Sequence, residues 1–218
     1  LAFQGNTDNG PTYASNVSEE WNGSTWAAVN TLNTPSSLAG GTGIVTAALC
    51  VGGELAGPGY GDSSRTEEYD GICWAAQTGR PASIRNHSLF GPQNDAISCM
   101  GIPGASTTAQ EWSGTAWTAG GVNNTQRIGA NDGTGSGTGG IVAGGQTPPS
   151  AVTGATELYN GTSWTSSPAS LSTARYSIST FGTDQNAVSA TGRTPTALTT
   201  VEEWTGIGAS VTQTLTTT

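Results

Sequence analysis

The sequence predicts an all-β fold, a β-propeller of about five blades with about four antiparallel strands each. Three observations lead to this prediction. The chain of 218 residues contains 33 glycines and only 10% charged residues. A short motif with two aromatic residues recurs along the whole chain at a spacing that suits one propeller blade. Several copies of this motif contain Asn-Gly or Asp-Gly, which is the strongest short signal for a tight β-hairpin.

The composition favours strands over helices. Glycine loses the most backbone entropy in a helix, and the abundant threonine is stiff there but fits a pleated surface. Short strands joined by many turns are therefore expected. The length suits a single domain, which we assign to residues 1–218.

The charge balance argues against two classes of partner. All basic residues are arginine, six in number, and the net charge is -9. A protein that binds nucleic acid or an anionic membrane surface needs a cationic patch, so neither partner is expected. No apolar run approaches the roughly 18 residues that a membrane span requires, so membrane insertion is not expected either.

The clearest repeat is a hairpin motif with an acidic residue, an aromatic residue, a turn and, in four of the five copies, a second aromatic residue. Successive first aromatic residues are 48, 43, 47 and 45 positions apart, which matches one blade. Because all seven tryptophans fall in these copies, we predict that the motif aromatics pack between blades. They are Trp21, Trp26, Tyr69, Trp74, Trp112, Trp117, Tyr159, Trp164 and Trp204.

Two weaker markers set the phase of the repeat. An apolar strand ending in glycine precedes each hairpin, and a Leu-x-Thr motif introduces the next first strand in three copies. The predicted blades are residues 1–31 (partial), 32–79, 80–122, 123–170 and 171–218. In this phase the chain opens on the second strand of a blade and stops before a further first strand. One inner strand is therefore unaccounted for, and we expect either an incomplete ring or part of a longer array.

The repeat resembles the kelch repeat over the whole chain. It has a basic residue early in the first strand, an apolar strand ending in Gly-Gly, an acidic-aromatic pair and then Trp. The variant Glu-Glu-Tyr/Trp-Asn-Gly-x-x-Trp with Leu-Asn-Thr is similar to kelch-like repeats of phage virion and tail-fibre proteins, especially marine ones. The spacing between the two aromatics is shorter than in ordinary kelch repeats, so ligand sites of cellular kelch adaptors are not carried over.

This resemblance implies a non-enzymatic structural or adhesion protein at the virion surface, hence extracellular. Its expected partners are other virion proteins, a host-surface glycan or a receptor, within an oligomeric assembly. A second interpretation is a scaffold or decoration protein that engages neighbouring subunits through the faces of the propeller. A third, less favoured interpretation is a carbohydrate-active enzyme.

The residues give little support to catalysis or to a bound cofactor, and neither a cofactor nor a metal is expected. His87 is the only histidine, so it has no second histidine with which to bind copper or zinc. The three cysteines, Cys50, Cys73 and Cys99, lack metal-ligand spacing and are expected to act as small buried apolar residues, with a disulfide between two of them left open. The Gly-rich stretch 133–140 lacks the Lys-Ser/Thr ending of a phosphate loop and is interpreted as a hairpin loop.

The candidate binding residues are three arginines, Arg85, Arg127 and Arg175, which are predicted to occupy the same place in their repeats, early in the innermost strand. Such a ring at one mouth of the central channel would offer donors to carboxylate or sulfate groups. It would also supply the arginine triad of a sialidase-like enzyme. The alternative is that each arginine pairs with a glutamate of the marker hairpins.

Overall fold

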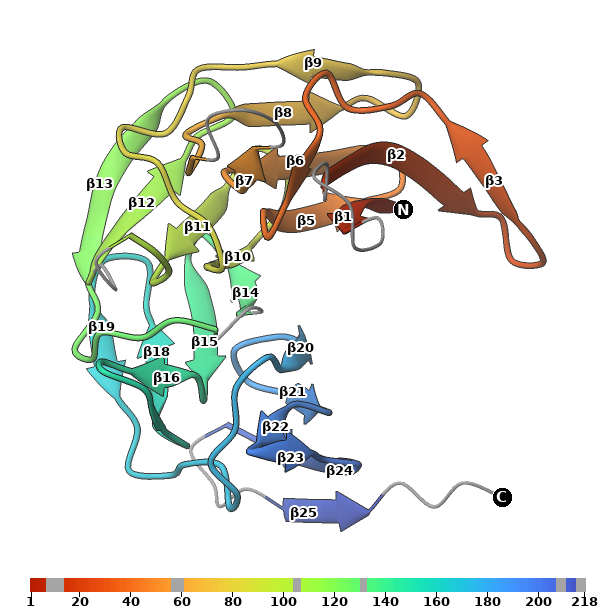
Figure 1. Cartoon of the computed structure of the whole chain (residues 1–218). Helices are drawn as coiled ribbons and strands as arrows, with labels where there is room; N and C mark the ends of the chain where they lie inside the picture. The colour runs from red at the N-terminus through yellow and green to blue at the C-terminus, as the bar shows by residue number, and fades with distance from the viewer. Residues whose placement is uncertain (7–13, 56–60, 104–106, 130–132, 207–210, 215–218) are drawn as a thin grey trace.

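The computed structural model arranges antiparallel sheets around a central axis (Figure 1). It describes residues 1–6, 14–55, 61–103, 107–129, 133–206 and 211–214, and within these ranges every regular element is a β-strand. This confirms the predicted class, a five-bladed β-propeller.

Each of blades 2 to 5 is a sheet of four strands that follow one another outward from the axis. Blade 2 has β5 (Gly40–Ile44), β6 (Ala47–Val51), β8 (Thr66–Tyr69) and β9 (Trp74–Ala76). Blade 3 has β10 (Ser88–Phe90), β11 (Ala96–Cys99), β12 (Thr108–Trp112) and β13 (Trp117–Val122). Blade 4 has β14 (Thr134–Ser136), β15 (Gly139–Ala143), β18 (Thr156–Tyr159) and β19 (Trp164–Ser166). Blade 5 has β20 (Ser179–Gly182), β21 (Ala187–Ala190), β24 (Thr200–Trp204) and β25 (Val211–Thr214).

Blade 1 is built differently. Its strands are β1 (Ala2–Asn6), β2 (Ala14–Trp21) and β3 (Trp26–Val29), and its sheet continues through the short β4 (Ser36–Ser37) to β7 (Glu54–Leu55). The strand β1 pairs with β2 as β6 pairs with β8 in blade 2, so β1 holds the place of a second strand. Figure 1 shows an open arc, with a gap between blade 1 and blade 5.

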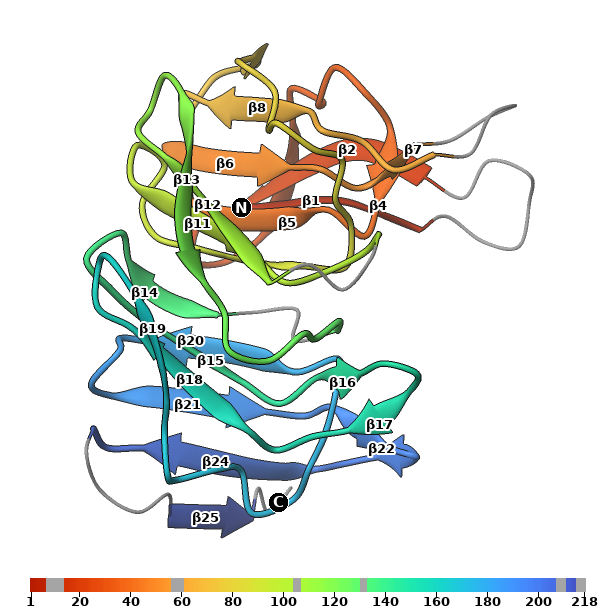
Figure 2. The ribbon, with the colours of Figure 1, turned by 90° about the vertical axis from the view of Figure 1, so that its left-hand side faces the viewer.

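The two ends of the propeller carry different loops. At one end lie the turns between the first and second strands and the marker hairpins between the third and fourth. At the other end lie the longer connections between the second and third strands, which include two small ribbons (Figure 2). These ribbons are β16 (Gln146–Thr147) with β17 (Ala151–Val152), and β22 (Arg193–Thr194) with β23 (Thr196–Ala197). We call the two ends the hairpin end and the long-loop end.

The marker aromatics of blades 2 to 4 lie at the interfaces between blades. Within each blade the two rings stack in a tilted arrangement, with centroids 5.0 to 5.2 Å apart. Their polar atoms donate to the blade before: the Trp74 indole to the Ser18 hydroxyl at 3.0 Å, and the Trp117 indole to the Thr66 hydroxyl at 2.9 Å. The interfaces of blades 2 and 3 with the blade before thus combine a buried aromatic pair with a satisfied donor.

Blade 1 departs from this rule. Trp21 is 47% exposed and Trp26 is 53% exposed, although their rings face each other as in the other blades. Among the described residues no blade precedes blade 1 to cover them. The expectation that these two tryptophans are core residues is therefore wrong, because the motif fixes the local hairpin and not the presence of a neighbour.

One interface lacks its hydrogen bond, which gives a prediction. The Trp164 indole nitrogen is buried without a partner among the described residues, and the residue that corresponds to Ser18 and Thr66 in blade 3 is Ala109. We expect Ala109→Ser to restore the bond and raise the free energy of unfolding by about 1 kcal/mol. Urea denaturation of Ala109→Ser against the parent and Ala109→Val, which adds volume without an acceptor, tests this. A serine variant no more stable than the valine variant would contradict it.

Candidate binding site

Two of the three predicted site arginines are enclosed in the protein. Arg127 and Arg175 are each 0% exposed. Arg127 pairs with Glu157 at 2.7 Å, and Arg175 pairs with Glu202 at 2.6 Å. Burial lowers the pKa of Arg127, and the nearby Glu157 opposes that shift. Both glutamates belong to marker hairpins, so these contacts correspond to the alternative interpretation of the arginines.

In blades 2, 4 and 5 a buried carboxylate on the third strand binds the segment that enters the blade. Glu157 accepts the backbone N–H groups of Asn124 at 2.7 Å and Thr125 at 3.0 Å, in addition to the guanidinium of Arg127. Arg127 itself also donates to the carbonyl of Gly144 at 3.0 Å. A carboxylate bound by two backbone N–H groups and an arginine is satisfied, which is the condition for burying a charge.

Arg85 does not share the repeat position of the other two. The carbonyl of Arg175 accepts a hydrogen bond from the N–H of Gly145 in the preceding blade. In blade 3 the corresponding hydrogen bond, from the N–H of Gly53, goes to the carbonyl of Ile84. Arg85 is therefore one position further along. Because neighbouring side chains in extended chain point to opposite sides, this shift sends the guanidinium away from the blade interior.

The side chain of Arg85 reaches the long-loop end. It pairs with Glu54 and, at 2.9 Å, with Asp62, and the three side chains are 27%, 31% and 18% exposed. The predicted ring of three arginines facing one ligand is therefore not the observed arrangement. Arg127 and Arg175 form ion pairs with buried carboxylates inside their blades. Arg85 forms ion pairs that connect a loop of blade 2 to blade 3.

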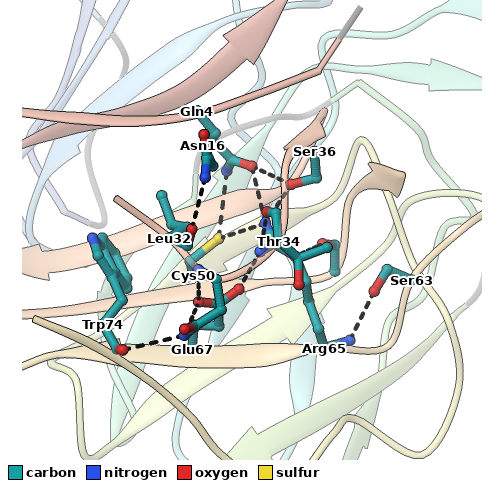
Figure 3. Close-up of polar contacts among 12 residues, drawn as sticks. Gln4, Asn16, Leu32, Thr34, Ser36, Cys50, Ser63, Arg65, Glu67 and Trp74 are labelled. Atoms are coloured by element: carbon teal, nitrogen blue, oxygen red, sulfur yellow. Dashed lines mark hydrogen bonds and ion pairs between the residues drawn. The ribbon is translucent and has the colours of Figure 1, made fainter. Parts of the chain in front are cut away.

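Blade 2 builds the same network with an arginine from the segment that leads into its third strand, β8. The residue that corresponds to Arg175 is Ser36, and the cation comes instead from Arg65, two residues before Glu67 (Figure 3). Arg65 donates to Glu67, to the Ser36 hydroxyl and, at 3.1 Å, to the Gly52 carbonyl. Sequence position did not reveal this substitution because Arg65 lies far from Ser36 in the chain.

Blade 3 replaces the ion pair with neutral residues. Ile84 stands in the arginine place, Gln110 stands in the glutamate place, and Pro81 removes one of the backbone N–H groups that the carboxylate would accept. The donor, the cation and the anion of this network are thus all absent from blade 3. The buried ion pair is thus a structural contact of the other blades that blade 3 folds without.

A buried polar cluster lies beside this neutral centre. His87 is 2% exposed, and neither ring nitrogen has a partner among the described residues. Burial, together with the nearby Arg80, lowers the pKa of His87 to about 3. Arg80 is 6% exposed, and its burial lowers the pKa of its guanidinium to about 10. His87 is therefore neutral at physiological pH.

The cysteines are free in the structure. Cys50 and Cys99 are buried and Cys73 is exposed, and none is paired. Burial raises the pKa of the Cys50 and Cys99 thiols to about 12, so neither is a ready thiolate nucleophile. In the described part of the chain, no group of three or more histidine, cysteine or acidic residues is placed to hold a metal ion. The same residues contain no helix long and apolar enough to cross a membrane.

The hairpin end contains a cavity that sequence reasoning missed. Its volume is about 410 Å³, and it is lined by the first strands and turns of blades 2, 3, 4 and 5. Phe181 of blade 5 and Ile44 of blade 2, both in the lining, are 56% and 66% exposed. The lining also includes Thr42, Pro92 and Thr134, and it has no charged side chain.

Glycines at the turns give this cavity its wall. Gly43, Gly91 and Gly135 all have positive φ, and a Cβ on any of them would lie within 2.3 Å of a carbonyl oxygen across the turn. The hydroxyls of Thr42 and Thr134 donate to carbonyls of the next blade at 2.6 Å. The Gly-rich stretch in blade 4, interpreted from sequence as a hairpin loop, forms one of these turns between β14 and β15. The glycine that recurs near the end of each first strand was the available signal.

These features define a β-propeller with a neutral cavity at one end of its axis. No protein-family model matches the chain, and no curated protein matches it. Solved structures do match, including one titled "Structure of YjhT", with a TM-score of 0.77 and 12% sequence identity over 97% of this chain and 79% of that chain. At this identity the likeness shows the fold alone.

Proposed function

We propose that this protein is a non-enzymatic binding propeller of the virion surface, a tail-fibre or surface component that attaches to a host glycan or receptor. The phage assignment and the extracellular location rest on the kelch-like repeat variant described above. The observation that supports binding is the 410 Å³ cavity at the hairpin end. Its size lies within the range of small-ligand sites.

The chemistry of the cavity favours a neutral ligand. Its lining combines an exposed phenyl ring, Phe181, with threonine hydroxyls and the backbone of glycine turns. A sugar ring offers C–H groups to an aromatic face and hydroxyls to backbone and threonine oxygens, so this mixture suits an uncharged saccharide. Acidic sugars would lack a cation, because the buried arginines do not reach the lining.

Glycan-array binding and adsorption of host cells test this proposal. We expect Phe181→Ala to weaken binding by about tenfold, which is about 1.4 kcal/mol. The control is Ile72→Ser, because Ile72 is an exposed apolar residue of a marker hairpin outside the cavity lining. Absence of binding to any host surface, or equal loss in both variants, would overturn it.

A second candidate function is a scaffold protein that docks against neighbouring subunits. The exposed Trp21 and Trp26 of blade 1 favour it, since large exposed aromatics are typical of protein interfaces. Sedimentation of purified virion components with the propeller would detect such a complex. A subunit contact above roughly 1,000 Å² of total buried area would support this function over receptor attachment.

A further inference from the structure

We propose that the interface between blades 2 and 3 binds a small inorganic anion of the size of chloride, held by the guanidinium of Arg80, the imidazole of His87 and the hydroxyl of Ser98. Both blades of this interface are complete, with four strands each. None of the three residues lines the cavity at the hairpin end. The inference is therefore independent of the proposed glycan site.

The first step concerns the place of Arg80. At the entry of blades 2 to 5, a backbone N–H donates to a carbonyl in or just before the third strand of the blade before. The donating residue is Leu32 in blade 2, Leu171 in blade 5 and Asn123 in blade 4. In blade 3 it is Arg80, which donates to Ser64 at 2.7 Å. A guanidinium thus occupies a place that holds leucine in two other blades.

The second step concerns the neighbours of this place. In blade 2, Leu32 and Cys50 belong to one buried apolar cluster, and Ala39 packs against it. Blade 3 has polar side chains at the three corresponding places, which are respectively Arg80, Ser98 and His87. The ring of His87 lies against blade 2, since a Cβ on Gly40 would come within 2.7 Å of its Nε2 atom. The three polar side chains therefore share the face of blade 3 that packs on blade 2.

The third step concerns hydrogen bonding. The three residues are buried, with exposed fractions of 6% for Arg80, 2% for His87 and 0% for Ser98. One N–H of Arg80 donates to the carbonyl of Ala82 at 3.0 Å. The Nε atom of Arg80, both ring nitrogens of His87 and the Ser98 hydroxyl have no partner among the described residues. Because buried polar atoms are normally hydrogen-bonded, this group suits a ligand that accepts from several donors at once.

The fourth step concerns charge. Within the described chain Arg80 forms no ion pair, whereas the network arginines of blades 2, 4 and 5 each bind a glutamate. In blade 3 the place of that glutamate holds Gln110. Burial lowers the pKa of Arg80 only to about 10, so the guanidinium keeps its charge at neutral pH. A buried charge needs a counter-charge, and a bound anion supplies one here.

The size of the ligand follows from the burial. At most 6% of each of the three residues is exposed, so a sugar, a nucleotide or a peptide could not reach them without separating the blades. Chloride is monoatomic, and it accepts charge-assisted hydrogen bonds from a guanidinium, from the one N–H of a neutral imidazole and from a hydroxyl. The anion thus has the role in blade 3 that the glutamate carboxylate has in blades 4 and 5.

Urea denaturation of the full chain in sodium chloride and in sodium gluconate, at equal ionic strength and neutral pH, tests the proposal. Gluconate is too large for the interface, and Arg80→Leu copies the leucine that blade 2 has at this place. We expect chloride to lower the unfolding equilibrium constant of the parent about tenfold more than that of Arg80→Leu, as for a ligand at about ten times its dissociation constant. The matched control is Arg193→Leu, which removes an exposed arginine outside the interface and should respond as the parent does.

Chloride NMR gives a second readout that does not depend on stability. Exchange of bound chloride should broaden the chloride resonance with the parent and with Arg193→Leu, but not with Arg80→Leu. Ser98→Ala, which removes only the hydroxyl, should weaken chloride binding by about tenfold. A parent that neither broadens the resonance nor differs from Arg80→Leu in its response to the two salts would overturn the proposal. Loss of both effects in Arg193→Leu would also overturn it, because the anion would then bind at the surface.

Discussion

Replacing Arg127 with isoleucine is expected to lower the free energy of unfolding by about 3 to 5 kcal/mol. The guanidinium is 0% exposed and pairs with Glu157, which is also 0% exposed. Without Arg127 the carboxylate stays buried with its two backbone donors but without its cation. Chemical denaturation measures the loss, and Arg85→Ile is the control. Because Arg85 and its two partners, Glu54 and Asp62, are partly exposed, each lost ion pair should cost no more than about 1 kcal/mol.

The double variant Arg127→Ile, Glu157→Gln should recover a large part of this loss. It copies the neutral pair Ile84 and Gln110 of blade 3. It thereby removes the carboxylate charge that the single variant leaves buried without a cation. We expect the double variant to be more stable than Arg127→Ile by at least about 2 kcal/mol. Strictly additive losses, or a single variant as stable as the parent, would show that the ion pair does not hold the blade entry.

The repeat period and the hairpins could be predicted from sequence because they are local. Asn160 and Gly161 adopt the turn that their residue types favour, and the asparagine side chain accepts the N–H of Thr162 and Ser163. The blade count follows from the spacing of such hairpins. No long-range information is needed for either.

The candidate site could not be predicted because it depends on register and on neighbours. A shift of one residue separates Arg85 from the position of Arg175, and in extended chain that shift reverses the direction of the side chain. The aromatic residues of the hairpin motif are buried in blade 2, whereas Trp26 of blade 1 is exposed. Their burial depends on whether an adjacent blade covers them. The cavity at the hairpin end combines turns from four blades, and the recurring glycine marks each turn but not their convergence.

Acidification is expected to destabilise the protein through His87. In the unfolded chain this residue has its ordinary pKa near 6.5, whereas in the folded protein burial, with Arg80 nearby, lowers the pKa to about 3. Between these values the unfolded state binds a proton that the folded state does not. The contribution of His87 to stability is therefore present above pH 6.5 and is lost as the pH falls, by about 1.4 kcal/mol per pH unit at most.

The variant His87→Ala isolates the pH-dependent contribution of His87 to stability, because His87 is the only histidine of the sequence. Alanine suits the position, since blade 2 carries Ala39 at the corresponding place. At pH 7 the variant should be less stable than the parent, since burial of the imidazole is lost. Between pH 6.5 and pH 4 its free energy of unfolding should fall less steeply than that of the parent. Parallel curves over that range, measured by urea denaturation at each pH, would mean that His87 takes up its proton in the folded state as readily as in the unfolded chain.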